Sequence, residues 1–211
     1  MRAIVTVTMN PTIDKSARVP RVAAGQKLRC EAPRHEPGGG GINVSRAIRR
    51  LGGESLALYP AGGPLGEMLQ GLLDQEDVHH SPVAIENMTR ENFTVFDEST
   101  DQQFRFGMPG PTLEEAEWQA CLDRVSSVEP APEYIVASGS LPPGVPDDFY
   151  ARLAQLGRDA GSRVIVDTSG EALCAAARAG VYLLKPNMRE LGQLAGRDIE
   201  GESAQESVAR N

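Results

Sequence analysis

PGGGGINVSRAIRRLGG, residues 37–53, is the stretch of sequence that decides the fold. Its four consecutive glycines run into a helical pattern in which Val44, Ile48 and Leu51 recur at i, i+4 and i+7. Glycines let a backbone pass close to a ligand because no Cβ intervenes, and a helix start offers unpaired N–H groups and the positive end of its dipole. Together they predict a cradle for an anion or a polar sugar. A flexible surface turn is the alternative.

The composition limits the class of partner. The chain has 211 residues, a formal net charge of −8 and a pI near 5.0. This balance argues against nucleic acid or an anionic membrane surface, whereas a locally basic site could still take a small anion. Three scattered cysteines without CxxC spacing indicate reduced thiols in a cytoplasmic protein. The first apolar run meets Asp14 too early for a signal peptide, and no segment has membrane-spanning length.

Short β-branched runs alternate with helical patterns along most of the chain. This alternation predicts an α/β fold, with a parallel sheet and helices packed on its faces. The expected core strands are residues 3–7, 55–59, 134–137, 164–166 and 181–184. The expected helices follow the glycine run, cover 65–73, begin at Thr112 with a capping box to Glu115, and cover 147–160, the alanine-rich stretch to Gly180, and 187–195.

Two segments break this alternation and predict a small second sheet. Residues 26–32 alternate apolar and charged side chains, as a half-exposed strand does. Residues 92–106 form two short runs around a polar turn, which predicts an antiparallel hairpin. We expect these strands to pair with one another.

Polar or small residues follow nearly every expected core strand. Ligands of an open parallel sheet bind beyond the carboxyl ends of its strands, although turns favour the same residue types. The exits carry Asn10 with Asp14, Gly62-Gly63, Ser138-Gly139-Ser140, Asp167, and Lys185 with Asn187.

Several common catalytic motifs do not fit the sequence. The glycine run is not a dinucleotide fingerprint, because GxGxxG would require glycine in place of Val44, and no Gly-Lys-Ser/Thr follows as in a Walker loop. There is no HExxH, paired CxxC or GxSxG motif. Metal-only and hydrolase functions are therefore disfavoured.

The segment Asn187–Glu190 has two interpretations. An N-cap residue with Glu three positions later forms a capping box, which alone accounts for both residues. Alternatively, a carboxylate at the strand exit holds Mg²⁺ through water while Lys185 approaches a phosphate. Spacing alone favours the structural interpretation.

The order of the motifs resembles the ribokinase-like sugar kinases, specifically the phosphofructokinase B family. PGGGGINVSRAIRRLGG resembles the first signature of that family, and the resemblance runs from about Ala3 to Ala195. KLRCEAP and FRFGMPG are most similar to the minor bacterial 6-phosphofructokinases. Matching motifs occur in the family's order: NPTID, PAGGPLG, TREN, FRFGMPG, SGSLPPGVP, VDTSGEAL and KPNMREL.

The resemblance implies a ribokinase-like parallel-sheet sandwich with a small β-sheet lid. The lid segments are about 15–35 and 90–107, within one incomplete kinase domain over residues 1–211. It implies ATP-dependent phosphorylation of fructose 6-phosphate to fructose 1,6-bisphosphate, with Mg²⁺ as cofactor. Fructose-1-phosphate and tagatose-6-phosphate kinases share most of the motifs. The lid of such kinases commonly pairs with that of another subunit, so the resemblance also implies a homodimer.

The resemblance assigns roles residue by residue. Those implied for the sugar phosphate are Asp14 for sugar hydroxyls, Gly39, Gly40, Gly41 and Asn43 for the fructose moiety, Arg90 for the phosphate and Ser140 as a further contact. Those implied for the nucleotide are Lys185 and Asn187 at its phosphates, Glu190 at Mg²⁺ with assistance from Asp167, and Lys27 reaching the nucleotide site of a neighbouring subunit.

The sequence departs from the family in one respect. The family's second signature, a Gly-Ala-Gly-Asp run whose amides form an anion hole and whose Asp is the catalytic base, does not occur before Asn211. We therefore expect the catalytic base, and the last part of the fold, to lie beyond Asn211, so that this chain is an inactive fragment of a longer kinase. The alternative is a naturally shortened, non-catalytic protein that binds sugar phosphate or pairs through its lid.

Overall fold

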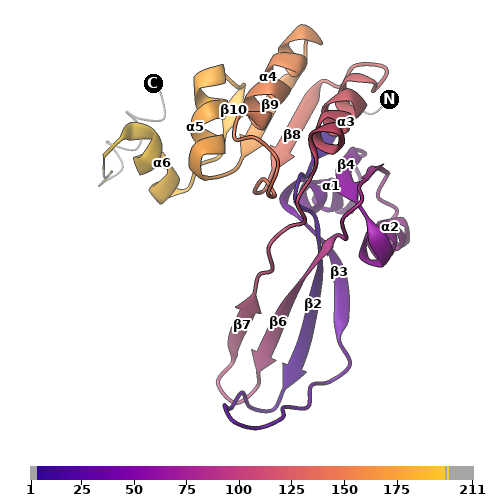
Figure 1. Ribbon diagram of the computed structural model, residues 1–211, viewed down its shortest axis with the longest axis vertical. Coiled ribbons are helices and arrows are strands. Elements are labelled where there is room, and N and C mark those ends of the chain that lie inside the picture. The colour runs from indigo at the N-terminus through magenta and orange to yellow at the C-terminus, as the bar shows by residue number, and fades with distance from the viewer. Residues whose placement is uncertain (1–3, 198, 200–211) are drawn as a thin grey trace.

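The computed structural model describes residues 4–197 and residue 199, which form two sheets with helices around the larger one (Figure 1). In these residues the larger sheet has the order β10-β9-β8-β1-β4-β5, and all of its strands run parallel. The α/β fold with a parallel sheet is therefore confirmed. The strands are β1 Ile4–Val7, β4 Leu56–Ala61, β5 His80–Ala84, β8 Tyr134–Ser138, β9 Arg163–Asp167 and β10 Leu183–Leu184. The helices are α1 Gly40–Arg50, α2 Gly63–Gln75, α3 Glu115–Ser126, α4 Phe149–Asp159, α5 Gly170–Ala179 and α6 Met188–Ala195.

Helices cover both faces of this sheet because its strands are apolar on both sides. Successive side chains of a strand point to opposite faces. Leu56 and Leu58 of β4 belong to a core with residues of α3 and α4, whereas Ala57 and Tyr59 belong to a core with residues of α1 and α2. Burial on both faces is typical of strands in a parallel sheet. None of the helices in the described part of the chain combines the length and apolarity needed to cross a membrane.

The second sheet extends away from the body of the molecule (Figure 1). Its order is β3-β2-β6-β7, with bounds Arg34–Gly38, Thr12–Val19, Arg90–Asp97 and Gln102–Phe106. The predicted hairpin is confirmed, since β6 and β7 pair antiparallel. The strand predicted at Gln26–Ala32 is wrong, because residues 20–33 contain neither helix nor strand. β2 takes its place beside β6, in parallel, and β3 pairs antiparallel with β2.

The buried face of α1 also differs from the prediction. Leu51 is 88% exposed, and the buried residues are Gly41, Ile42, Ser45 and Arg46. Apolar periodicity did not predict this face, because two of its four buried residues, Ser45 and Arg46, are polar and form hydrogen bonds with other side chains. The Ser45 hydroxyl lies 2.8 Å from that of Thr6 and accepts a hydrogen bond from Ser55 at 2.8 Å.

Two smaller features of the fold differ from the predictions made from the sequence. The capping box of α3 uses Glu114 and Glu117, not Thr112 and Glu115. Thr112 instead lies in the extended segment before the helix, where its carbonyl accepts a hydrogen bond from the Asn87 side chain at 2.9 Å. β5, at the edge of the main sheet, was not predicted.

Candidate functional site

The glycine turn lies where α1 meets the ends of β1 and β8. Gly39 is the N-cap of α1, and its φ of 119° is a conformation that favours glycine. A Cβ on Gly40 would overlap the Ser138 hydroxyl, and a Cβ on Gly38 would overlap the Asp14 carboxylate. A Cβ on Gly41 would lie 2.5 Å from the Val7 carbonyl oxygen. The glycines therefore allow the start of α1 to reach the strand ends, and a loose surface turn does not account for them.

We expect Gly41→Ala to destabilise the fold by about 3 kcal/mol, because the Val7 carbonyl that its Cβ would meet is backbone of the central strand and cannot turn aside. Gly71→Ala is the matched control, since a Cβ there meets no described atom within 4 Å and Gly71 lies inside α2. Replacing that helical glycine should stabilise the protein by roughly 0.5–1 kcal/mol. Urea unfolding of both variants tests this, and equal stabilities would contradict it.

Asp14, Arg90 and Ser140 are brought together around the exit of β1. Asp14 on β2 accepts a hydrogen bond from the Asn92 side chain at 3.2 Å. Arg90, at the start of β6, donates from Nη2 to the Asn10 carbonyl at 3.0 Å and from Nη1 to the Met108 carbonyl at 2.8 Å. Asn10 Nδ2 in turn donates to Ser140 Oγ at 3.1 Å. Asn10 therefore connects two of the predicted site residues.

Unpaired polar atoms also concentrate here. Two buried side-chain atoms lack a hydrogen-bond partner within the described residues, namely Arg90 Nε and Asn10 Oδ1. Buried polar atoms are nearly always paired, so an orphan indicates a water, a ligand or a functional strain. Burial lowers the pKa of Arg90, against the opposing effect of the Asp14 carboxylate. A partly buried guanidinium with spare donors suits an anionic ligand.

A second group of predicted residues lies at the exits of β9 and β10. Lys185 Nζ is 3.2 Å from Asp167 Oδ1, and Ser138 Oγ donates to Asp167 Oδ2 at 3.1 Å. Ser138 is also the residue against which Gly40 packs, so it joins this group to the glycine turn.

Asn187 and Glu190 form the capping box of α6. Asn187 Oδ1 accepts from the Glu190 amide at 3.0 Å, and Glu190 Oε2 accepts from the Asn187 amide at 2.8 Å. The structural interpretation of this pair is therefore confirmed. The described residues contain no cluster of three His, Cys, Asp or Glu side chains able to hold a metal. Mg²⁺ commonly binds one or two carboxylates together with water and substrate phosphates, so Glu190 and Asp167 fit that role only alongside a nucleotide.

Lys27 lies near neither the residues around Arg90 nor those at the exits of β9 and β10. It is exposed in the loop of residues 20–33, which lies at the end of the second sheet farthest from the body (Figure 1).

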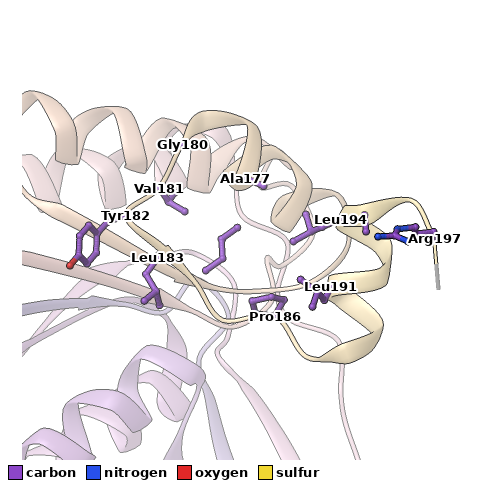
Figure 2. A pocket seen from close by; sticks show the side chains of 11 residues that line it. Ala177, Gly180, Val181, Tyr182, Leu183, Pro186, Leu191, Leu194 and Arg197 are labelled. Carbon is purple, nitrogen blue, oxygen red and sulfur yellow. The ribbon is translucent and has the colours of Figure 1, made fainter. Parts of the chain in front are cut away.

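A hollow of about 880 Å³ lies between α5, β10 and α6, and one of the residues that line it, Pro186, stands between Lys185 and Asn187 in the sequence. Figure 2 shows that most of the side chains around it are apolar, among them Leu183, Pro186, Leu191 and Leu194. β10 is the outer strand of the sheet on this side, and Leu183 is 47% exposed. Within the described residues, β10 therefore exposes apolar side chains at this edge of the sheet.

Arg46 is a site-adjacent residue that sequence reasoning missed. It belongs to α1, and its side chain is only 10% exposed. Nε and Nη2 each donate to a Glu76 oxygen at 2.6 Å, and Nη2 also lies 3.5 Å from Glu36 Oε1. Nη1 donates to the Pro37 carbonyl at 2.9 Å and to Asn43 Oδ1 at 3.3 Å. Pro37 and Asn43 flank the glycine turn, so Arg46 braces both of its sides. The sequence pattern does not distinguish Arg46 from Arg49 and Arg50, which lie in the same helix and are exposed.

The Arg46–Glu76 pair gives stability a pH dependence. Hydrogen bonds from Arg46 hold the pKa of Glu76 below its usual value, and those bonds raise the pKa of Arg46. A carboxyl with a depressed folded-state pKa stabilises the fold above its unfolded pKa of about 4.3, and that contribution is lost as the pH falls through the folded value. We therefore expect the stability of the wild type to fall more than that of Glu76→Gln between about pH 5 and 3. Urea unfolding across this range measures it, and parallel profiles would contradict it.

Comparison with known proteins decides the family. The model of the pfkB family carbohydrate kinases matches residues 4–210. The chain belongs to this family. It is 45% identical over 206 residues to ATP-dependent 6-phosphofructokinase isozyme 2 of Mycobacterium tuberculosis, covering 98% of this chain and 60% of that protein. It is 33% identical to 1-phosphofructokinase of Bacillus subtilis, covering 97% of this chain and 66% of that one.

Solved structures agree with this assignment to the pfkB family. Phosphofructokinase-2 from Escherichia coli in complex with fructose-6-phosphate superimposes with a TM-score of 0.94 at 42% identity, covering all of this chain and 69% of that one. The ribokinase-like fold expected from the motifs is therefore confirmed. The chain spans about 60% of the length of the first curated relatives that it matches.

Proposed function

We propose that these residues form the acceptor-binding part of an ATP-dependent 6-phosphofructokinase, which transfers a phosphoryl group in line to a hydroxyl of fructose 6-phosphate. The observation that carries this proposal is the group around Arg90, where a partly buried guanidinium with an unpaired Nε lies beside Asn10 and Ser140. Members of a carbohydrate kinase family bind a sugar, and a cation at the acceptor site favours a sugar that already carries a phosphate. The names of the relatives agree with that substrate.

Within this proposal, the glycine turn and its neighbours hold the sugar phosphate. Asp14 accepts hydrogen bonds from sugar hydroxyls, Arg90 holds the phosphate, and Ser140 is a further contact with the substrate. Gly39, Gly40 and Gly41 let the sugar approach the start of α1, where the helix dipole favours anionic oxygen. Asn43, exposed on the first turns of α1, is a further contact.

The exits of β9 and β10 supply the nucleotide side in this proposal. Lys185 and Asn187 hold phosphates of ATP, while Glu190, assisted by Asp167, organises Mg²⁺ through water. The metal would offset negative charge on the transferring phosphoryl group. Capping of α6 is compatible with this role, because Glu190 uses one carboxylate oxygen for the cap. The apolar edge at β10 is where we propose that the remaining length of such a kinase packs.

The second sheet serves as the lid of the acceptor site in this proposal, and two lids pair to form a homodimer. Its outer strand β7 carries Phe104 and Phe106, which are 37% and 49% exposed. Exposed apolar side chains on an edge strand favour pairing with another chain. Lys27 would then reach the nucleotide site of the neighbouring subunit, in a cytoplasmic enzyme.

A comparison of acceptors tests the function. We expect a chain of the relatives' length to show its highest kcat/KM with fructose 6-phosphate, measured against fructose 1-phosphate and tagatose 6-phosphate in a coupled ADP assay. A preference for fructose 1-phosphate would favour the second candidate, 1-phosphofructokinase, which the Bacillus subtilis relative supports. Activity with unphosphorylated fructose equal to that with its phosphates would contradict the proposed role of Arg90.

A further inference from the structure

Asn43 has its side-chain orientation fixed by Arg46. An arginine side chain can only donate hydrogen bonds, so the Asn43 atom 3.3 Å from Nη1 must be the amide oxygen. The amide nitrogen, with its two hydrogens, takes no part in that contact, and Asn43 is an exposed residue. Asn43 thus presents a donor to a ligand in the glycine turn, whereas the Asp14 carboxylate presents an acceptor when ionised.

The guanidinium of Arg46 has no donor to spare for solvent. Its five N–H groups face five acceptors: two Glu76 oxygens, one Glu36 oxygen, the Pro37 carbonyl and Asn43 Oδ1. The two contacts with Glu76 fix the plane of the guanidinium, because a bidentate pair restrains both its position and its tilt. Nη1 has its own two partners, the Pro37 carbonyl and Asn43 Oδ1, at the entry to and the exit from the glycine turn.

We propose that Arg46 is a positioning residue of the acceptor site: it commits Asn43 to donating a hydrogen bond to a sugar or phosphate oxygen and holds the Pro37 carbonyl at the entry to the glycine turn. This inference rests on the proposed function. Because Glu76 lies at the C-terminal cap of α2, the brace also connects the acceptor site to the body of the fold. This arrangement selects ligands by their hydrogen-bonding groups. The ligand oxygen that faces Asn43 must accept a hydrogen bond, whereas a hydroxyl that faces Asp14 donates one.

Arg46→Lys and Glu76→Gln separate this role from simple support of the fold. Lysine keeps the charge, but its donors lie on one nitrogen that cannot reach Glu76, Pro37 and Asn43 together. Glutamine removes the charge at position 76 and keeps one acceptor oxygen, so one of the two contacts with the guanidinium is lost. The two Nη1 contacts, with Pro37 and Asn43, do not involve position 76. Both variants weaken the ion pair, but only Arg46→Lys loses the hold on Asn43.

The test uses a chain of the relatives' length that carries these residues. In Arg46→Lys we expect the KM for fructose 6-phosphate to rise about tenfold, the loss associated with one well-placed hydrogen bond, while the KM for ATP changes less than about twofold. In Glu76→Gln we expect both KM values to stay within about twofold of wild type. Equal increases in the KM for fructose 6-phosphate in the two variants, at equal loss of thermal stability, would overturn the proposal.

A second measurement does not depend on turnover. The side-chain amide signals of Asn43 in a ¹H–¹⁵N spectrum, assigned by their loss in Asn43→Ala, should shift in Arg46→Lys and stay in place in Glu76→Gln. Unchanged Asn43 signals in Arg46→Lys would overturn the positioning role. If wild type phosphorylates none of the sugar phosphates, the proposed function fails, and the amide signals still decide whether Arg46 positions Asn43.

Discussion

The 211-residue polypeptide, given ATP, Mg²⁺ and fructose 6-phosphate, is expected to turn over at least about 10⁴-fold more slowly than a kinase of its relatives' length. The sequence has no Gly-Ala-Gly-Asp run, the motif that the family resemblance associates with the base and the anion hole. A general base contributes roughly 10²- to 10⁴-fold, and one anion-hole donor about 10²- to 10³-fold. Phosphoryl transfer depends mostly on positioning and charge stabilisation, so losing both removes most of the rate enhancement.

A coupled ADP assay measures this rate, with the full-length Escherichia coli relative as the positive control. Binding of fructose 6-phosphate to the same polypeptide, followed by calorimetry, shows whether the acceptor site is formed. Binding without turnover is the expected pair of results. Robust turnover would show that these residues contain their own base and anion hole, and would contradict the division into acceptor-binding and transferring parts.

Features that depend on local sequence were predictable. The capping box of Asn187 and Glu190 involves residues three apart, and the hairpin of β6 and β7 is formed by two runs joined by a short turn. In both cases the interacting groups are neighbours in the chain, so the residue pattern alone contains the information.

Features that depend on distant partners were not predictable in the same way. The strand beside β6 is β2, from nearly 80 residues earlier, and the sequence pattern favoured residues 26–32 instead. The buried face of α1 was predicted wrongly because Ser45 and Arg46 are buried against a hydroxyl on β1 and a carboxylate at the C-cap of α2. A polar residue in a core is specified by its partner, and hydrophobic periodicity carries no record of that partner.

The candidate site also combines residues that the sequence pattern predicted with one that depends on distant partners. The polar residues that follow the strands include Ser140, Asp167 and Lys185, which are predicted site residues because a parallel sheet brings its carboxyl ends to one edge. Asp14 was grouped with those exits but lies within β2, on the second sheet. Arg46 was missed because its function, as inferred above, is to hold Asn43 and Pro37 and not to face a ligand.

Replacement of Arg90 by alanine should raise the KM for fructose 6-phosphate by about 100-fold in a chain of the relatives' length, while the KM for ATP changes little. Charge-assisted hydrogen bonds to a phosphate are worth about 1.5–3 kcal/mol, and the upper part of that range corresponds to this factor. Arg90 lies at the start of β6, and its contacts are the carbonyls of Asn10 and Met108. The nucleotide residues proposed here follow β9 and β10, on other strands.

Arg90 also braces two backbone segments, so its loss could act by loosening the site instead of by removing a phosphate contact. Arg90→Gln separates these effects, because glutamine can donate to one of the two carbonyls but carries no charge. If Arg90 binds phosphate, both variants lose affinity for fructose 6-phosphate, and neither changes kcat/KM for unphosphorylated fructose. Equal losses for fructose and its phosphate would make Arg90 a brace alone, and an equal loss for ATP would contradict its assignment to the acceptor side.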